Sequence, residues 1–174
     1  MTCTTGRAWV YGDHLDTDEI CPAEILLSTS DPAELARHAM APIDPEFSTK
    51  VQPGDILVAG RNAGCGSSRE QAPLALKSAG IAVVIAESFA RVFYRNCITI
   101  GLPALRCPGI RAKVTNGDTL QVDVQTGRIR HLASGDALQA EALEEPALSI
   151  VLDGGLINHL LRKRGSPAAA AHGR

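Results

Sequence analysis

The sequence has few aromatic residues and no excess of positive charge, and both absences narrow its function. Aromatic side chains make up 3% of the 174 residues, and the formal net charge is −2. Proteins that bind nucleic acid usually present a basic surface, often with aromatic rings that stack on bases. The apolar runs are also short, and even residues 81–86 could not span a bilayer. Composition therefore argues against a nucleic-acid-binding or membrane-spanning protein.

The cysteines lack the spacing of a metal site or of a disulfide framework. They are five in number with no C-x-x-C pair, at Cys3, Cys21, Cys65, Cys97 and Cys107. An odd set of scattered cysteines predicts free thiols in a reducing compartment. The first residues show no apolar segment of the secretory type, so we expect a cytoplasmic protein. Its length predicts a single domain over residues 1–165, with a disordered tail at residues 166–174.

Strand and helix patterns alternate in the middle of the chain. Residues 56–59 and 81–86 are apolar runs typical of buried strands. A helical pattern follows each run, over residues 70–79 and from about residue 88 to 96. This alternation predicts an α/β fold with a partly parallel sheet flanked by helices. Residues 119–132 add a small β hairpin in the C-terminal part.

The flanking segments give weaker patterns. Residues 7–11 predict a first strand, and residues 12–32 are polar and rich in turn residues around an apolar centre. Asp31 followed by Pro32 is typical of a helix start, and predicts a helix over residues 32–40. Residues 41–53 contain three prolines and predict a loop. Residues 149–164 have helical periodicity that two adjacent glycines interrupt.

The glycine-rich residues 60–69 (GRNAGCGSSR) join the first buried strand to its helix. Backbone N–H groups converge at such a turn, and together with Ser67, Ser68 and Arg69 they could hold a carboxylate or phosphate. The same groups would stabilise the negative charge of a deprotonated serine. The alternative is that Ser67 or Ser68 only caps the helix, with Glu70 or Gln71 completing a capping box. No lysine follows the glycines, so the segment is not a P-loop.

Two further groups of charged residues, one acidic and one basic, could have either a functional or a purely structural role. The acidic side chains of one loop could bind a cation or could simply form polar turns: Asp13, Asp16, Asp18 and Glu19. Their spacing is not that of an EF-hand. Arg91 and Arg95 would share one face of a helix, which could be a solvated face. The five histidines form no catalytic or metal-binding pattern.

Three separated segments resemble the small subunit of 3-isopropylmalate dehydratase and homoaconitase. They are residues 12–23 (GDHLDTDEICPA), 60–73 (GRNAGCGSSREQAP) and 88–103 (SFARVFYRNCITIGLP), and the resemblance covers about residues 6–105. This family corresponds to the swivelling domain of the aconitase superfamily. The resemblance implies a β/β/α swivelling fold and a heterodimeric or heterotetrameric hydro-lyase. A separate large subunit would carry the [4Fe–4S] cluster, and this chain would bind none.

The resemblance also implies roles for individual residues. Ser67 would act as an alkoxide that removes a proton from the carbon next to a carboxylate, while Asp18 assists near the departing hydroxyl. Ser68 and Arg69 would bind a substrate carboxylate. Cys97, Thr99 and Ala63 depart from the residues common in the family.

Substrate choice in this family is set by the loop that contains Ile25, Leu26, Leu27 and Ser28. Leu27 stands where homoaconitase-type chains have an arginine that meets an extra carboxylate. An apolar side chain suits an alkyl group, so we expect isopropylmalate, as in leucine biosynthesis, or a related alkylmalate. The alternatives are a homoaconitase, a 2,3-dimethylmalate or citramalate enzyme, and a carboxylate-binding regulatory module. The apolar residues of this loop could also be plain core.

Overall fold

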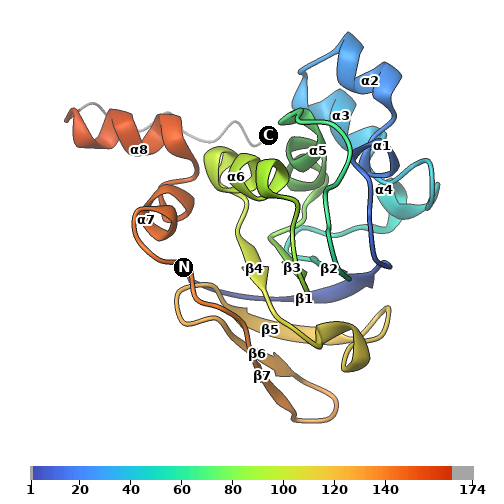
Figure 1. Ribbon diagram of the computed structural model, residues 1–174, viewed down its shortest axis with the longest axis vertical. Coiled ribbons are helices and arrows are strands. Elements are labelled where there is room, and N and C mark those ends of the chain that lie inside the picture. Colours follow the sequence, from blue (N-terminus) through green and yellow to red (C-terminus); the bar gives the residue numbers. More distant parts are fainter. Residues whose placement is uncertain (1, 166–174) are drawn as a thin grey trace.

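The computed structural model describes residues 2–165, through which one mixed sheet of seven strands runs (Figure 1). The strands lie in the order β4-β3-β2-β1-β5-β6-β7. They are β1 (Cys3–Val10), β2 (Ile56–Ala59), β3 (Val83–Ala86), β4 (Ala104–Arg106), β5 (Thr119–Asp123), β6 (Arg128–His131) and β7 (Ala137–Gln139). The helices are α1 (Thr17–Ile20), α2 (Ala23–Ser28), α3 (Pro32–Arg37), α4 (Phe47–Lys50), α5 (Gln71–Ala79), α6 (Arg91–Ile100), η1 (Ile110–Ala112), α7 (Ala147–Leu152) and α8 (Leu156–Lys163).

Strand β1 joins the two parts of the sheet. Its first residues, Cys3 to Arg7, pair antiparallel with β5, and its last three pair in parallel with β2. β2, β3 and β4 continue the parallel part, whereas β5, β6 and β7 form an antiparallel meander below it in Figure 1. The hairpin predicted in the C-terminal part is thus confirmed, and it extends the same sheet.

Both faces of the parallel part are covered. In β2, Leu57 and Ala59 face the core that α3, α4, α5 and α6 close, whereas Ile56 and Val58 face a second core. The second core contains Ile110 of η1, side chains of β5 and β6, and Val151 of α7. A strand buried on both faces needs a continuous apolar run, which is why β2 could be predicted from its sequence.

Several helix boundaries follow from local chemistry. The Asp31 side chain accepts a hydrogen bond from Glu34 N at 3.1 Å and Pro32 opens α3, as predicted. Gly80 ends α5 in the left-handed conformation, with φ of +115°. The predicted loop at residues 41–53 is partly wrong, because α4 lies within it and buries Phe47 completely. Residues 12–32, for which the sequence indicated turn residues around an apolar centre, contain both α1 and α2.

The sequence also predicted a disordered tail, a single domain and the absence of a membrane-spanning segment. The disordered tail predicted for residues 166–174 lies outside the described residues, and the single domain stays a prediction. Within residues 2–165, no helix is long and apolar enough to cross a membrane.

Candidate functional site

The loops that follow β1, β2 and β3 meet at the carboxyl ends of these parallel strands. Gly60 N donates to Gly12 O at 3.0 Å, and Gly64 N donates to Leu15 O at 2.7 Å. Ala63 N donates to Ser88 O at 3.0 Å, which ties the loop after β2 to the loop after β3. Open α/β sheets bind ligands at this edge, because the loops there present side chains and free backbone groups together.

Ser67 lies at this edge of the sheet, and its hydroxyl contacts the hydroxyl of Thr17. The two side-chain oxygens are 3.0 Å apart, and Ser67 N donates to Thr17 Oγ1 at 2.8 Å. Thr17 N in turn donates to Cys65 O at 2.8 Å. Thr17 is completely buried, whereas Ser67 is partly exposed. The serine hydroxyl therefore has a fixed position and access to a ligand from outside.

A glycine is required at two positions of the loop. At Gly66, φ is +100°, and a Cβ atom would lie 2.6 Å from both carboxylate oxygens of Asp16. At Gly64, φ is +78°, and a Cβ atom would lie 1.9 Å from the ring of Phe93. Residues with a side chain are strained in this backbone conformation and would also displace their neighbours.

Neither Ser67 nor Ser68 caps the helix that follows the loop. α5 begins at Gln71 behind Glu70, and no side chain makes a capping hydrogen bond there. The alternative that Ser67 or Ser68 caps this helix is therefore wrong. Ser68 is exposed, and its carbonyl accepts a hydrogen bond from Asn96 Nδ2 of α6 at 2.9 Å. This contact fixes the backbone just before the half-buried Arg69.

Most of the acidic cluster has a structural role. Asp16 caps α1 by accepting from Asp18 N at 2.8 Å, and Glu19 accepts from Asp16 N at 2.9 Å. Asp13 accepts from Arg61 N at 2.7 Å. The Asp18 carboxylate is exposed next to Thr17, so α1 brings Asp18 and Ser67 to the same region. Asp18 is thus the member of the cluster that is left for a ligand.

The predicted specificity segment is helix α2. Leu26 is only 2% exposed and belongs to the core, as the plain-core alternative expects, and Ile25 is half-buried against it. Leu27, in contrast, is 71% exposed, and Ser28 beside it is exposed as well. Ser30 Oγ accepts from Gln71 Nε2 at 3.4 Å, which links the end of this segment to the first residue of α5. Leu27 and Ser28 are therefore the residues of the segment that are free to meet a ligand.

Cys65 is not a candidate nucleophile, although it lies two residues from Ser67. Burial and the nearby Asp16 carboxylate raise the pKa of its thiol, so it stays protonated at neutral pH.

Within residues 2–165, no three His, Cys, Asp or Glu side chains come together as a metal site. Cys21 and Cys97 are buried in the core that α3, α4, α5 and α6 close, and Cys107 is buried in the second core.

Two side chains of this site were not predicted from the sequence. Thr17 holds Ser67, and Asn96 holds the backbone of Ser68. Each lies inside a segment that was identified from the sequence, residues 12–23 and 88–103. Neither threonine nor asparagine is a typical catalytic residue type, so the sequence alone offered no reason to select them. A contact between residues 50 positions apart can only be found once the loops are placed beside each other.

Comparison with known proteins gives consistent matches. Residues 29–109 match the family model of the aconitase C-terminal domain. The 3-isopropylmalate dehydratase small subunit of Pyrobaculum calidifontis is 57% identical over 155 residues, which cover 89% of this chain and 95% of the relative. The isopropylmalate/citramalate isomerase small subunit of Methanocaldococcus jannaschii is 52% identical over 158 residues, 91% of this chain and 94% of the relative.

A solved structure matches as well. The crystal structure of 3-isopropylmalate dehydratase from Methanocaldococcus jannaschii aligns with a TM-score of 0.88 and 42% identity, covering 93% of this chain and 95% of that chain. The expected aconitase-like α/β fold is thus confirmed. Relatives at 50% identity carry two other names, a 2,3-dimethylmalate dehydratase small subunit of Eubacterium barkeri and a methanogen homoaconitase small subunit of Methanothermobacter thermautotrophicus. The chain belongs to the family of 3-isopropylmalate dehydratase small subunits, as the three sequence segments predicted.

Proposed function

We propose that this chain is the small subunit of a hydro-lyase that interconverts 2-isopropylmalate and 3-isopropylmalate by loss and re-addition of water. The observation that carries the proposal is the Ser67 hydroxyl, which is held by Thr17 in a glycine-rich loop at the ligand-binding edge of the sheet. Family membership supplies the reaction class, and the relatives from Methanocaldococcus jannaschii and Pyrobaculum calidifontis both have isopropylmalate in their names.

In this proposal Ser67 is the base. Its alkoxide takes the proton from the carbon next to a substrate carboxylate, and the hydroxyl on the neighbouring carbon leaves as the double bond forms. Re-addition of water to the other carbon completes the isomerisation, and Ser67 returns the proton. Thr17 supports the base, because its hydroxyl can donate to the Ser67 oxygen once that oxygen has lost its own proton.

The remaining residues bind or orient the substrate. Arg69 and the Ser68 hydroxyl hold a carboxylate, for which a guanidinium offers two parallel donors. Asp18 lies next to Thr17 and assists at the departing hydroxyl. Leu27 contacts the alkyl group of the substrate and leaves no partner for a third carboxylate, so an alkylmalate is favoured over homocitrate.

In this proposal the iron–sulfur cluster belongs to a large partner subunit, and the support for it is membership of an aconitase-related family of small subunits. When the cluster is bound in that subunit, its iron supplies a Lewis acid for the departing hydroxyl. The complete enzyme is a heterodimer or heterotetramer. All five cysteines of this chain are free thiols, which suits a reducing compartment such as the cytoplasm.

The test is reconstitution with a cluster-loaded large subunit and measurement of isopropylmaleate hydration by its ultraviolet absorbance. We expect Ser67→Ala to lower turnover at least about a thousandfold, while the complex still assembles. Its folding stability should fall by only about 0.5–1.5 kcal/mol, since a single hydrogen bond to Thr17 is lost. Unchanged turnover by Ser67→Ala would refute Ser67 as the base and would favour a carboxylate-binding module.

The substrate is tested on the same reconstituted enzyme. Isopropylmalate, citramalate, 2,3-dimethylmalate and homocitrate are compared by kcat/KM. The proposal requires isopropylmalate or another alkylmalate to be the preferred substrate, and a preference for homocitrate would contradict the argument from Leu27.

A further inference from the structure

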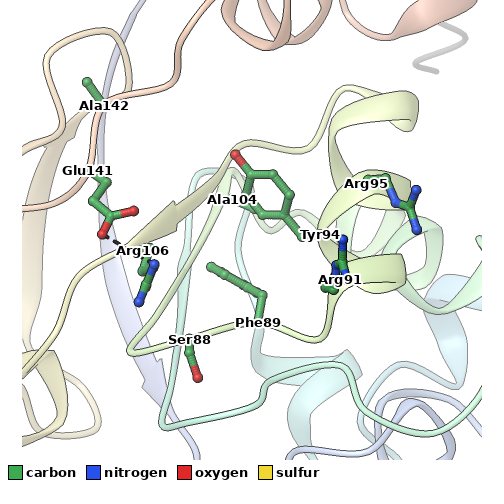
Figure 2. Close-up of a pocket in the computed structure, with 9 residues that line it drawn as sticks. All are labelled: Ser88, Phe89, Arg91, Tyr94, Arg95, Ala104, Arg106, Glu141 and Ala142. Atoms are coloured by element: carbon green, nitrogen blue, oxygen red, sulfur yellow. Dashed lines mark ion pairs between the residues drawn. The ribbon is translucent and has the colours of Figure 1, made fainter.

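A recess lies beside the loop that carries Ser67. It has a volume of about 580 Å³ and opens between α6, β4, the loop after β3 and the loop after β7 (Figure 2). Its lining is formed by Ser88, Phe89, Arg91, Tyr94, Arg95, Ala104, Arg106, Glu141 and Ala142. None of these residues has a part in the chemistry proposed for Ser67.

The charges of this recess are unevenly balanced. Arg106 faces Glu141 at 3.5 Å, so one end is close to neutral. Arg91 and Arg95 lie one turn apart on α6, and within residues 2–165 neither forms an ion pair with a carboxylate. Two like charges at this spacing repel each other weakly. The Arg91 end of the recess is therefore positively charged and lacks an internal partner.

Aromatic rings lie between the two ends of the recess. The ring centroids of Phe89 and Tyr94 are 5.7 Å apart, and both side chains are only half-buried. Figure 2 shows the Phe89 ring between Arg106 on one side and Arg91 and Arg95 on the other. The guanidinium groups are thus spread along a rim and do not converge on one point. Aromatic residues at the centre with arginine around them are typical of the energetic centre of a protein interface.

Two hydrogen bonds connect the recess to the Ser67 loop. Asn62 N donates to Ser88 Oγ at 2.8 Å, and Asn96 of α6 donates to the Ser68 carbonyl at 2.9 Å. α6 and the loop after β3 therefore lie directly beside the Ser67 loop, which a partner would cover to exclude water from the reaction. A large surface that covers Ser67 would therefore extend over α6.

We propose that the large subunit docks over this recess and places acidic side chains against Arg91 and Arg95, with an apolar side chain against Phe89. The inference rests on the proposed function, because that function supplies the partner. A free small anion is the less favoured occupant, since the arginines do not surround a single point. Recognition by opposite charge would speed the encounter of the subunits and make their affinity dependent on salt.

The test is the double substitution Arg91→Glu with Arg95→Glu. Its binding to a cluster-loaded large subunit that assembles with the wild-type chain is measured by calorimetry without substrate. Both positions are exposed, and a glutamate in the first turn of α6 suits the helix dipole, so the fold should persist and is checked by thermal melting. Arg111→Glu with Lys113→Glu makes the same change of charge at two exposed positions around η1 and is the matched control.

We expect the α6 double variant to bind about tenfold or more weakly, and its binding to vary less with salt than that of the wild type. The η1 double variant should bind as the wild type does. The inference is overturned if the α6 variant assembles with wild-type affinity or if both double variants lose affinity equally. It is also overturned if malate or phosphate binds the free chain through Arg91 while assembly is unaffected by the substitutions.

The same calorimetry separates this inference from the proposed function. Ser67→Ala should assemble normally and fail in turnover, which concerns only the chemistry. The α6 double variant should recover turnover when the large subunit is raised to saturating concentration, because its serine is intact. If the Ser67→Ala result contradicts the proposed function, the binding result for α6 is unaffected, and the reverse also holds.

Discussion

Thr17 fixes the position of the Ser67 hydroxyl and, in the proposed reaction, would also determine how easily that oxygen carries a negative charge. Its oxygen already accepts the hydrogen bond from Ser67 N, so its own proton is free to point at Ser67 Oγ, 3.0 Å away. A threonine hydroxyl has one proton and two lone pairs, and this arrangement uses the proton and one lone pair on the same neighbour. Burial of Thr17 keeps water from competing for that proton.

We predict that Thr17→Val lowers kcat of the reconstituted enzyme by about tenfold to a hundredfold. A hydrogen bond to a charged group contributes about 1.5–3 kcal/mol, which corresponds to this change in rate. Without the donor, the pKa of the serine rises, so the limb of the pH–rate profile on which activity increases should move to higher pH. The profile is measured with wild type and variant under saturating substrate.

Thr17→Ser is the matched control for this prediction. It keeps the hydroxyl and removes only the methyl group, so activity and the pH profile should return close to those of the wild type. If Thr17→Ser were as impaired as Thr17→Val, the role of Thr17 would be packing and the hydrogen-bond argument would be wrong.

Among the elements, α2 shows what a sequence pattern can and cannot decide. Its apolar residues 25–27 were compatible both with core and with a binding surface. Helical geometry resolves the question residue by residue, because consecutive side chains point in directions about 100° apart: Leu26 is buried and Leu27 is 71% exposed. Without the packing of α2 against the core, the sequence could not say which leucine meets the solvent.

We predict that Leu27→Arg shifts specificity away from alkylmalates and toward homocitrate. The arginine would supply a partner for a third carboxylate and would remove apolar contact with an alkyl group. Because Leu27 is exposed, stability should change by less than about 0.5 kcal/mol. The ratio of kcat/KM for isopropylmalate to that for homocitrate is the measurement, and we expect it to fall about tenfold or more.

Leu132→Arg is the control for charge and size. Leu132 is also an exposed leucine, at 43%, and lies directly after β6 in the antiparallel part of the sheet. Its substitution should leave the ratio unchanged. An equal effect of both substitutions, or none from Leu27→Arg, would show that α2 does not set the substrate.

At the scale of the whole molecule, the parallel part of the sheet was the most predictable feature. β2 has the bounds expected from its apolar run, and β3 begins two residues later than its run does. α6 begins at Arg91 and not near residue 88, because Phe89 pairs with Ala63 and Ala90 is still extended. Such boundaries depend on contacts between distant loops. The same holds for the candidate site. The residues proposed to react, such as Ser67, were named from the sequence, whereas the contacts of Thr17 and Asn96 that support them could only be found from the fold.

Asp55 connects β1 to β2 at the opposite end of the strands from the site. It lies just before β2 and is only 5% exposed. Its carboxylate accepts hydrogen bonds from Trp9 Nε1 at 2.8 Å, Gln52 N at 3.0 Å and Arg7 N at 3.1 Å, and the Arg7 guanidinium lies 3.3 Å away. Burial alone would raise the pKa of Asp55, but these hydrogen bonds and the arginine charge outweigh it, and the pKa is lowered.

A lowered pKa makes Asp55 a source of stability that depends on pH. The contribution is fully present above the pKa of an unfolded aspartate, about 4, and is lost as the pH falls through the lower value of the folded protein. We predict that Asp55→Asn lowers the free energy of unfolding at pH 7 by about 1–3 kcal/mol, because the amide nitrogen faces donors that the carboxylate satisfied. The difference from wild type should then shrink as the pH is lowered from about 5 to about 2, since protonation removes the same charge.

Urea titrations of both proteins across this pH range give that difference directly, because the other carboxylates titrate in both proteins and cancel. Asp136→Asn, at an exposed position in the meander, is the control and should cost less than about 0.5 kcal/mol. A difference for Asp55→Asn that stays constant from pH 7 to pH 2 would mean that the loss comes from shape and packing. The charge of Asp55 would then not be what holds β1 against the start of β2.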